Sequence, residues 1–200
     1  MKIIGHRGAK GIAPENSLLA IQKAIDMGVD SIEVDIRLHN KHLVLSHDET
    51  VKTKEYCRLD EALDLIKGNK LIVLDIKELG TVKKLLSLLK DYDGEVVFSS
   101  KKYDVLQKIR RLEPDANLAV IESWSGVRAV AQASLLNTNR IHINHNWLWS
   151  GFVRSMKHRG YDLYAFTVNT VERADELQTW GVNGIFTDFP NLFAKSKNKN

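Results

Sequence analysis

The stretch Ser31-Ile32-Glu33-Val34-Asp35-Ile36 is short and rich in β-branched residues, which is typical of a buried β-strand. Similar runs recur along the chain and give eight candidate strands. These strands are predicted at residues 2–5, 31–36, 71–76, 95–99, 117–121, 140–143, 162–166 and 184–186. Most of the segments between them are long enough to hold one helix.

The connecting segments show the spacing of amphipathic helices. Their apolar faces are formed by Leu18, Leu19, Ile21, Ala24 and Ile25 in one segment and by Leu85, Leu86, Leu88 and Leu89 in another. A strand followed by a helix, repeated along the chain, indicates a parallel sheet.

Eight such units predict an α/β protein with a (β/α)8 TIM barrel in a single domain. Barrels of this kind usually have ~250 residues, and the 200 residues here are enough because the connections are short. The alternative is an open doubly wound sheet, which usually carries a G-x-G-x-x-G turn after its first strand. Residues 5–11, GHRGAKG, lack that spacing.

One gap in the pattern holds no helix. After Asp35 the chain turns at His39-Asn40-Lys41 and runs back through residues 43–45 to His47. Asparagine can adopt the left-handed conformation that a tight turn requires, and the alternation after the turn suits a short strand. We therefore expect a short hairpin after the second strand, and this hairpin would bring His47 near His6.

The composition describes one compact domain, which we place at residues 1–194, followed by a flexible basic tail at 195–200. The formal charge of +4 falls to +1 without the three lysines of that tail, so the charge gives no reason to expect a nucleic-acid partner. The single cysteine, Cys57, excludes an internal disulfide and a cysteine-based zinc site.

Two further absences concern location. The apolar run at the start, Met1-Lys2-Ile3-Ile4, is too short to act as a signal peptide. No stretch of ~18 uncharged apolar residues occurs anywhere, so no stable membrane insertion is expected. These features predict a cytoplasmic protein.

The charged residues of the first three predicted strands are the main candidates for a functional site. Glu33 and Asp35 are two apart on one strand, so their side chains leave the same face, and such a pair inside an apolar strand favours a bound cation. Asp75 and Lys77 end the third strand with the same spacing. Because the working groups of these barrels lie at the C-terminal ends of the strands, these side chains should meet there.

Carboxylate oxygens are the ligands that Mg²⁺ and Ca²⁺ prefer, so we expect Glu33, Asp35 and Asp75 to hold one of these ions. Arg7 and Lys77 then remain to hold an anion that also touches the metal. A small phosphodiester fits this charge pattern better than a neutral molecule does.

The motifs resemble those of the glycerophosphodiester phosphodiesterase family, in the family's order and over nearly the whole chain. The matching fragments are His6-Arg7-Gly8, Pro14-Glu15-Asn16-Ser17, Ile32-Glu33-Val34-Asp35, His47-Asp48, Asp75-Ile76-Lys77 and GVNGIFTDFP at 181–190. The resemblance implies a (β/α)8 barrel, a divalent metal and hydrolysis of phosphodiesters such as glycerophosphocholine. It also implies His6 and His47 as general acid and base, and it allows a cyclic phosphate intermediate.

The chain departs from the family pattern in two places. The family usually has Glu where this chain has Asp75, which is one methylene shorter. The family also usually inserts a substrate-contacting segment between the second and third strands, whereas residues 50–69 leave little room for one. Spider-venom-type phospholipases D are similar in having an Asp as the third ligand.

Three further residues are candidates for substrate or phosphate contacts. Glu15 is placed to hold His6 or Arg7 by a hydrogen bond, and Glu122 and Trp124 follow the fifth strand toward the mouth of the barrel. Asn16 is expected to be a local structural residue, because Asn16 or Ser17 caps the helix that follows.

The expected function is metal-dependent hydrolysis of glycerophosphodiesters to sn-glycerol 3-phosphate and an alcohol. One alternative is a phospholipase D-like activity on lysophospholipids. The other is a catalytically silent barrel that binds a phosphate ligand. The sequence leaves open whether the chain forms homo-oligomers.

Overall fold

The computed structural model describes residues 1–68 and 70–193. Its strands are β1 Lys2–Gly5, β2 Ser31–His39, β3 His42–Leu45, β4 Leu71–Ile76, β5 Val96–Ser100, β6 Leu118–Glu122, β7 Arg140–Asn144, β8 Asp162–Phe166 and β9 Gly184–Thr187. Its α-helices are α1 Leu18–Asp26, α2 Leu59–Ile66, α3 Val82–Leu89, α4 Tyr103–Leu112, α5 Gly126–Leu135, α6 Ser150–His158 and α7 Val171–Trp180. Short 3₁₀ turns lie at Leu79–Thr81, His145–Trp147 and Pro190–Leu192.

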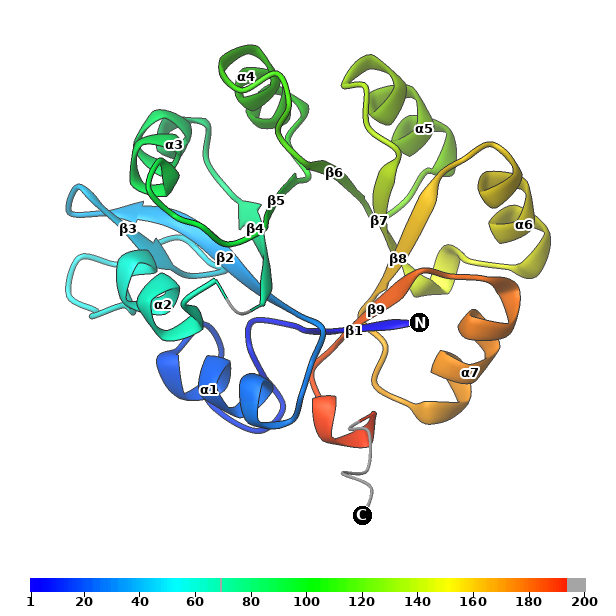
Figure 1. Ribbon diagram of the computed structural model, residues 1–200, viewed down its shortest axis with the longest axis horizontal. Coiled ribbons are helices and arrows are strands. Elements are labelled where there is room, and N and C mark those ends of the chain that lie inside the picture. Colours follow the sequence, from blue (N-terminus) through cyan, green and yellow to red (C-terminus); the bar gives the residue numbers. More distant parts are fainter. Residues whose placement is uncertain (69, 194–200) are drawn as a thin grey trace.

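Eight of the strands close into a parallel barrel, as the sequence predicts. The order around the sheet is β1-β9-β8-β7-β6-β5-β4-β2, and the pairing of β1 with β2 completes the ring. The helices surround this ring on its outer side (Figure 1). A large apolar core lies between the sheet and the helices, because each helix turns its apolar face toward the strands.

The hairpin after the second strand is also confirmed. β3 pairs antiparallel with β2 on the outside of the barrel, and the turn uses Asn40 and Lys41 with φ of 46° and 67°. Because both φ values are positive, the turn matches the right-handed twist of a two-residue hairpin. Figure 1 shows β2 and β3 reaching beyond the ring between α2 and α3.

Side chains that point into the barrel form two layers. The lower layer is apolar and contains Ile4, Val73, Val97, Ala119, Tyr164 and Phe186. Four of these residues lie two positions before a residue of the upper, largely polar layer, on the same strand: Val73 before Asp75, Val97 before Ser99, Ala119 before Ile121 and Tyr164 before Phe166. The apolar layer therefore closes the barrel beneath the site.

Other sequence predictions meet the structure in different ways. Ser17 caps α1, since its hydroxyl accepts a hydrogen bond from the Ala20 N–H at 3.1 Å.

Burial, followed by Glu61, raises the pKa of the half-buried Cys57 thiol to about 11. The tail predicted at 195–200, and the domain boundary at 194, lie outside the described residues. None of the described helices is long and apolar enough to cross a bilayer.

Candidate active site

Seven of the ten predicted site residues gather in one cavity at the C-terminal end of the barrel. The cavity has a volume of about 290 Å³. Its lining is formed by His6, Arg7, Glu33, Asp35, His47, Asp75, Lys77, Ser99, Lys101, Ile121, His142, Asn144, Phe166, Thr167 and Phe186. A larger, shallower hollow of about 650 Å³ lies at the other end, among the loops that precede β6, β7 and β8, and contains none of the predicted site residues.

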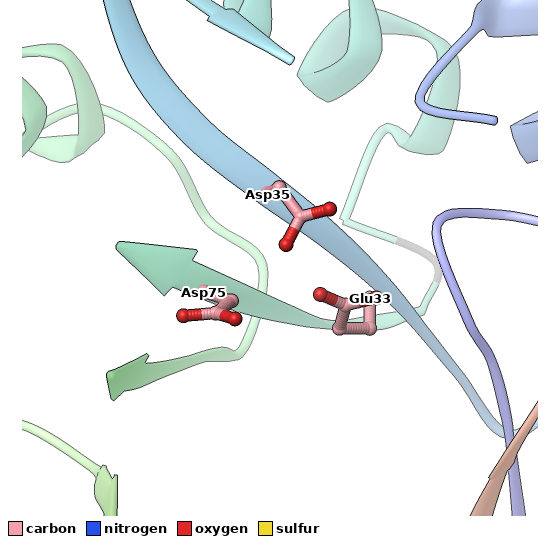
Figure 2. A group of neighbouring side chains, drawn as sticks. All are labelled: Glu33, Asp35 and Asp75. Atoms are coloured by element: carbon pink, nitrogen blue, oxygen red, sulfur yellow. The ribbon is translucent and has the colours of Figure 1, made fainter. Parts of the chain in front are cut away.

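Three buried carboxylates lie together on two neighbouring strands. Glu33 and Asp35 project from β2, and the register pairs Asp35 with Asp75 of β4. One oxygen from each carboxylate lies within 4.8 Å of the other two, and the residues are only 4%, 1% and 8% exposed. Figure 2 shows the three side chains converging from these two strands. This geometry suits a single cation with hard oxygen ligands.

The pKa values show that the three carboxylates compete for positive charge. Burial, and then the neighbouring Asp35 and Asp75, raise the pKa of Glu33 well above its ordinary value. Burial also raises the pKa of Asp75. Asp35 is equally buried, but Lys77, Asn16 and Arg7 outweigh the effect of burial and lower its pKa. Negative charge is therefore held most firmly at Asp35 and least firmly at Glu33.

Lys77 lies against the carboxylates. Its Nζ is 2.6 Å from Asp35 Oδ1 and also contacts Asp75 Oδ2. Although burial lowers the pKa of Lys77, Asp75 and Asp35 more than compensate, and the net shift is upward. Lys77 therefore stays charged and provides part of the counter-charge for the acidic cluster.

Arg7 supports the cluster from the loop after β1. Its backbone N–H donates to Glu33 Oε2 at 2.8 Å, and its Nε lies 3.2 Å from Asp35 Oδ2. The guanidinium donates through Nη1 to both oxygens of Glu15, at 3.0 and 2.9 Å. The predicted hydrogen bond from Glu15 thus forms with Arg7, and Glu15 itself stands outside the cavity lining.

Asn16 takes a larger part than the sequence analysis expected. It is buried, its Nδ2 donates to Asp35 Oδ2 at 2.9 Å, and its Oδ1 accepts from the Asp35 N–H at 3.1 Å. The prediction of a merely local role is therefore wrong, since Asn16 fixes a carboxylate 19 positions away. Its backbone φ of 55° lies in the left-handed region, which asparagine adopts more readily than most residues.

His6 is anchored by a carboxylate that the sequence analysis did not assign. Its Nδ1 lies 2.6 Å from Oδ1 of Asp188, the residue after β9. Asn169 fixes Asp188 in turn: it donates through Nδ2 to Asp188 Oδ2 at 2.9 Å, and its Oδ1 accepts from the Asp188 N–H at 2.9 Å. Burial raises the pKa of Asp188, but the hydrogen bonds from His6 and Asn169 outweigh it and the net shift is downward.

Replacing Asp188 with asparagine is expected to lower stability by ~1–3 kcal/mol near neutral pH, because it removes a charged partner from a partly buried histidine. The folded-state pKa of Asp188 lies below the value of ~3.9 for an unfolded chain, so its stabilisation is present above that pH and is lost as the pH falls through the folded-state pKa. Thermal melts of both proteins should therefore differ above about pH 5 and converge in stronger acid. Asp48→Asn, which changes an exposed partner of His47, is the matched control and should alter the melting temperature little.

His47 lies at the end of the hairpin and has a weaker anchor. Its Nδ1 is 2.8 Å from Asp48 Oδ1, and the Asp48 side chain is 90% exposed. The hairpin is tied to the barrel by the Ser46 N–H, which donates to the Asp35 carbonyl at 3.0 Å. In both histidines Nδ1 is engaged by a carboxylate, so that Nε2 is the ring nitrogen left for a bound molecule.

Glu122 and Trp124 do not line the cavity. The Glu122 carboxylate is buried and accepts from the N–H groups of Ser123 and Trp124, both at 2.8 Å, and from Arg128. Burial raises the pKa of Glu122, but these hydrogen bonds outweigh it and lower the pKa overall. Glu122 thus organises the start of α5, and Trp124 points outward with 69% of its surface exposed.

Several lining residues carry no sequence signal of their own. His142 is buried beside Tyr164 and Phe186, and burial, followed by Arg140, lowers its pKa to about 3, so the ring is neutral. Ser99 and Lys101 enter from β5 and the loop after it. His142, Ser99 and Lys101 are single polar residues on separate strands or loops. Only the closed barrel shows that they line the same cavity.

Comparisons with known proteins agree with this geometry. The model of the glycerophosphoryl diester phosphodiesterase family matches residues 6–56 and 62–192. A glycerophosphodiester phosphodiesterase of Caldanaerobacter subterraneus is 27% identical, over 94% of this chain and 94% of its own. Another, from Bacillus subtilis, is 24% identical over 97% of this chain and 85% of its own.

Solved structures match the fold over almost its full length. An Oleispira antarctica phosphodiesterase in complex with the product sn-glycerol-3-phosphate gives a TM-score of 0.89 at 23% identity, covering 96% of this chain and 94% of that one. A Thermotoga maritima glycerophosphodiester phosphodiesterase gives 0.83 at 23% identity, covering 96% of each. Since the matched family segments include both histidines, the three carboxylates and Asp188, the chain belongs to the glycerophosphoryl diester phosphodiesterase family.

Proposed function

We propose that this enzyme hydrolyses glycerophosphodiesters to sn-glycerol 3-phosphate and an alcohol, and that it requires a divalent cation. The observation that carries the proposal is the meeting of three buried carboxylates, three cationic side chains and two carboxylate-anchored histidines in one cavity. The names of the relatives and the product complex of the Oleispira antarctica phosphodiesterase support the same substrate class.

The carboxylates fit a divalent cation by charge and by ligand type. Among the described residues, two cationic side chains, Lys77 and Arg7, contact the three buried carboxylates, and the raised pKa of Glu33 marks the shortage of positive charge. Glu33, Asp35 and Asp75 would hold the ion, and their oxygens suit Mg²⁺ or Ca²⁺. When bound, such an ion supplies Lewis-acid stabilisation to phosphoryl oxygens.

The cationic side chains are set to bind the phosphate group. Glu15 holds the Arg7 guanidinium through both of its oxygens, so the guanidinium is already oriented before an anion arrives. Lys77 lies at the cavity wall between two carboxylates, where it can bind a phosphoryl oxygen without leaving them. Both groups would stabilise the negative charge that grows on those oxygens during the reaction.

His6 and His47 would move the two protons. One ring donates a proton to the departing alcohol oxygen, and the other accepts a proton from the attacking oxygen. Each Nδ1 is held by a carboxylate, so the exchange takes place at Nε2. In glycerophosphodiesters the neighbouring glycerol hydroxyl can be the attacking group; a cyclic phosphate then forms as the alcohol leaves, and water opens it.

The test is release of sn-glycerol 3-phosphate from glycerophosphocholine by protein stripped with EDTA and then supplied with Mg²⁺ or Ca²⁺. We expect turnover only after metal is added, and ³¹P NMR of the time course would reveal the cyclic phosphate. Equal rates with and without EDTA would contradict the metal requirement. Phosphate binding without turnover of glycerophosphocholine or bis(p-nitrophenyl) phosphate would instead identify a silent binding barrel.

A further inference from the structure

His142 is a buried histidine of the cavity that the proposed mechanism does not use. It is 2% exposed and lines the cavity from β7. Its ring makes edge contacts with the rings of Tyr164 and Phe186, at centroid distances of 5.6 and 4.8 Å. Both of these rings belong to the apolar layer that closes the barrel. Packing therefore fixes the His142 ring at the base of the cavity.

Among the described residues, the ring of His142 has no hydrogen-bond partner. Two other polar residues of the lining are already paired within the protein. Ser99 donates to the Leu74 carbonyl at 3.2 Å, and the Asn144 side chain accepts from the Asn146 N–H at 3.0 Å. Because a buried polar group without a partner is unfavourable, the free nitrogens of His142 point to a partner that binds in the cavity.

The charge of the ring limits what that partner can be. Burial, followed by Arg140, lowers the pKa of His142 to about 3, so the ring is neutral at the pH of the reaction. A neutral imidazole has one N–H donor and one nitrogen acceptor, which suits a hydroxyl group. The phosphate group instead finds positive charge at Arg7, Lys77 and Lys101, which line other parts of the cavity.

The order of the strands places His142 opposite the acidic cluster. Three strands separate β7 from β2 in either direction around the ring (Figure 1). A substrate whose phosphate group lies beside Lys77 and Arg7 must therefore extend one arm across the cavity to reach His142. The cavity has a volume of about 290 Å³, and the apolar layer closes its base. Since the alcohol has to leave after cleavage, the arm at the closed base is the glycerol.

We propose that His142 hydrogen-bonds to the sn-1 hydroxyl of the glycerol and makes the enzyme specific for diesters in which this hydroxyl is free. This inference rests on the proposed function of the cavity. The neighbouring 2-hydroxyl stays close to phosphorus, whereas the sn-1 hydroxyl is at the far end of the glycerol. Ile121 and Phe166, which also line the cavity, would pack against the glycerol carbons.

The test compares kcat/KM for glycerophosphocholine and for its analogue in which hydrogen replaces the sn-1 hydroxyl. The analogue keeps the 2-hydroxyl, so a cyclic phosphate can still form from it. With saturating Mg²⁺ or Ca²⁺, we expect wild type to use the analogue about 10- to 100-fold less well, because the analogue leaves a buried ring nitrogen unpaired. In His142→Phe, which fills the same space with an apolar ring, the two substrates should differ by less than about threefold.

Two further variants separate hydrogen bonding from packing. His142→Gln keeps a polar group at this position and should discriminate between the substrates more strongly than His142→Phe does. Tyr164→Phe is the matched control, because it keeps the ring beside His142 and removes only the hydroxyl that accepts from Arg140 at 3.3 Å. This control should keep the wild-type ratio.

Equal kcat/KM of wild type on the two substrates would overturn the proposal, and this measurement needs no variant to fold. The proposal is also overturned if His142→Phe keeps the wild-type ratio, if the Phe and Gln variants have equal ratios, or if Tyr164→Phe loses the ratio. Failure of wild type on both substrates would refute the proposed function itself, whereas turnover of both without discrimination would refute only the role of His142.

Discussion

Replacing His6 with alanine is expected to lower kcat on glycerophosphocholine by about two to four orders of magnitude, because a positioned proton donor or acceptor contributes that much. The same loss is expected for His47→Ala. Neither histidine belongs to the apolar core, so both variants should keep the barrel intact. Initial rates with saturating metal measure the effect, and circular dichroism verifies the fold.

A second substrate separates the acid from the base. The p-nitrophenolate group leaves bis(p-nitrophenyl) phosphate without needing a proton, so the variant that lacks the general acid should retain far more activity on this diester than on glycerophosphocholine. The variant that lacks the general base should be impaired on both. Losses below tenfold in both variants would contradict the roles that we propose for the histidines.

Replacing Glu33 with glutamine should abolish activity and yet stabilise the metal-free protein. Burial and two neighbouring carboxylates raise the pKa of Glu33, which shows that its negative charge is unfavourable in the folded chain without metal. A neutral amide keeps the shape and still accepts the hydrogen bond from the Arg7 N–H. We expect a gain of ~1–3 kcal/mol in EDTA, which is roughly 2–4 °C per kcal/mol for a domain of this size.

Asp35→Asn is the matched comparison, and it should act in the opposite direction. Asp35 is held by Lys77, Arg7 and Asn16, which lower its pKa, so removing its charge takes one of the two carboxylate partners from the buried Lys77. We expect a loss of a few kcal/mol in EDTA, about 3 by the usual effect of breaking a buried ion pair. Thermal melts with and without Mg²⁺ or Ca²⁺ test both variants, and neither should gain the stability that we expect the metal to give to wild type. A shift of the same sign for both in EDTA would contradict this account.

The sequence predicts the fold well because its signals are local. Each strand is a short β-branched run, and each helix has one apolar face, so the order of elements can be predicted without knowing their contacts. The hairpin also has a local cause, in the positive φ of Asn40 and Lys41. Closure of the ring depends on pairing between strands that are far apart in the sequence. The number of strand–helix units is the sequence feature that indicates it.

The site is predicted where spacing places residues on one face, and missed where contacts join distant segments. Glu33, Asp35 and Asp75 follow from the two-residue period of a strand. Asn16 and Asp188 could not be assigned in this way, because their partners lie 19 and 182 positions away. Both stand within the family-like motifs, at Pro14-Glu15-Asn16-Ser17 and at 181–190, and those motifs were the available signal.

Glu122 shows the opposite case, because the sequence predicts it as a substrate contact and it does not line the cavity. A carboxylate at the end of a barrel strand resembles a substrate contact, and in this chain it accepts hydrogen bonds from the loop that follows and from Arg128. Backbone N–H groups in a loop need a hydrogen-bond acceptor, and a carboxylate at the end of a strand can meet that need just as it can bind a substrate. Sequence position alone does not separate these two uses.

The bond between His6 and Asp188 has a consequence for the order in which the protein is made. A ribosome has joined all three carboxylates of the proposed cation site by residue 75, but β9 and Asp188, which follows it, emerge more than a hundred residues later. β1 also waits for β9 as one of its two neighbours. A nascent chain therefore holds the three carboxylates of the proposed cation site long before His6 is anchored, and the proton transfer that we propose for His6 becomes possible only after Asp188 has been joined.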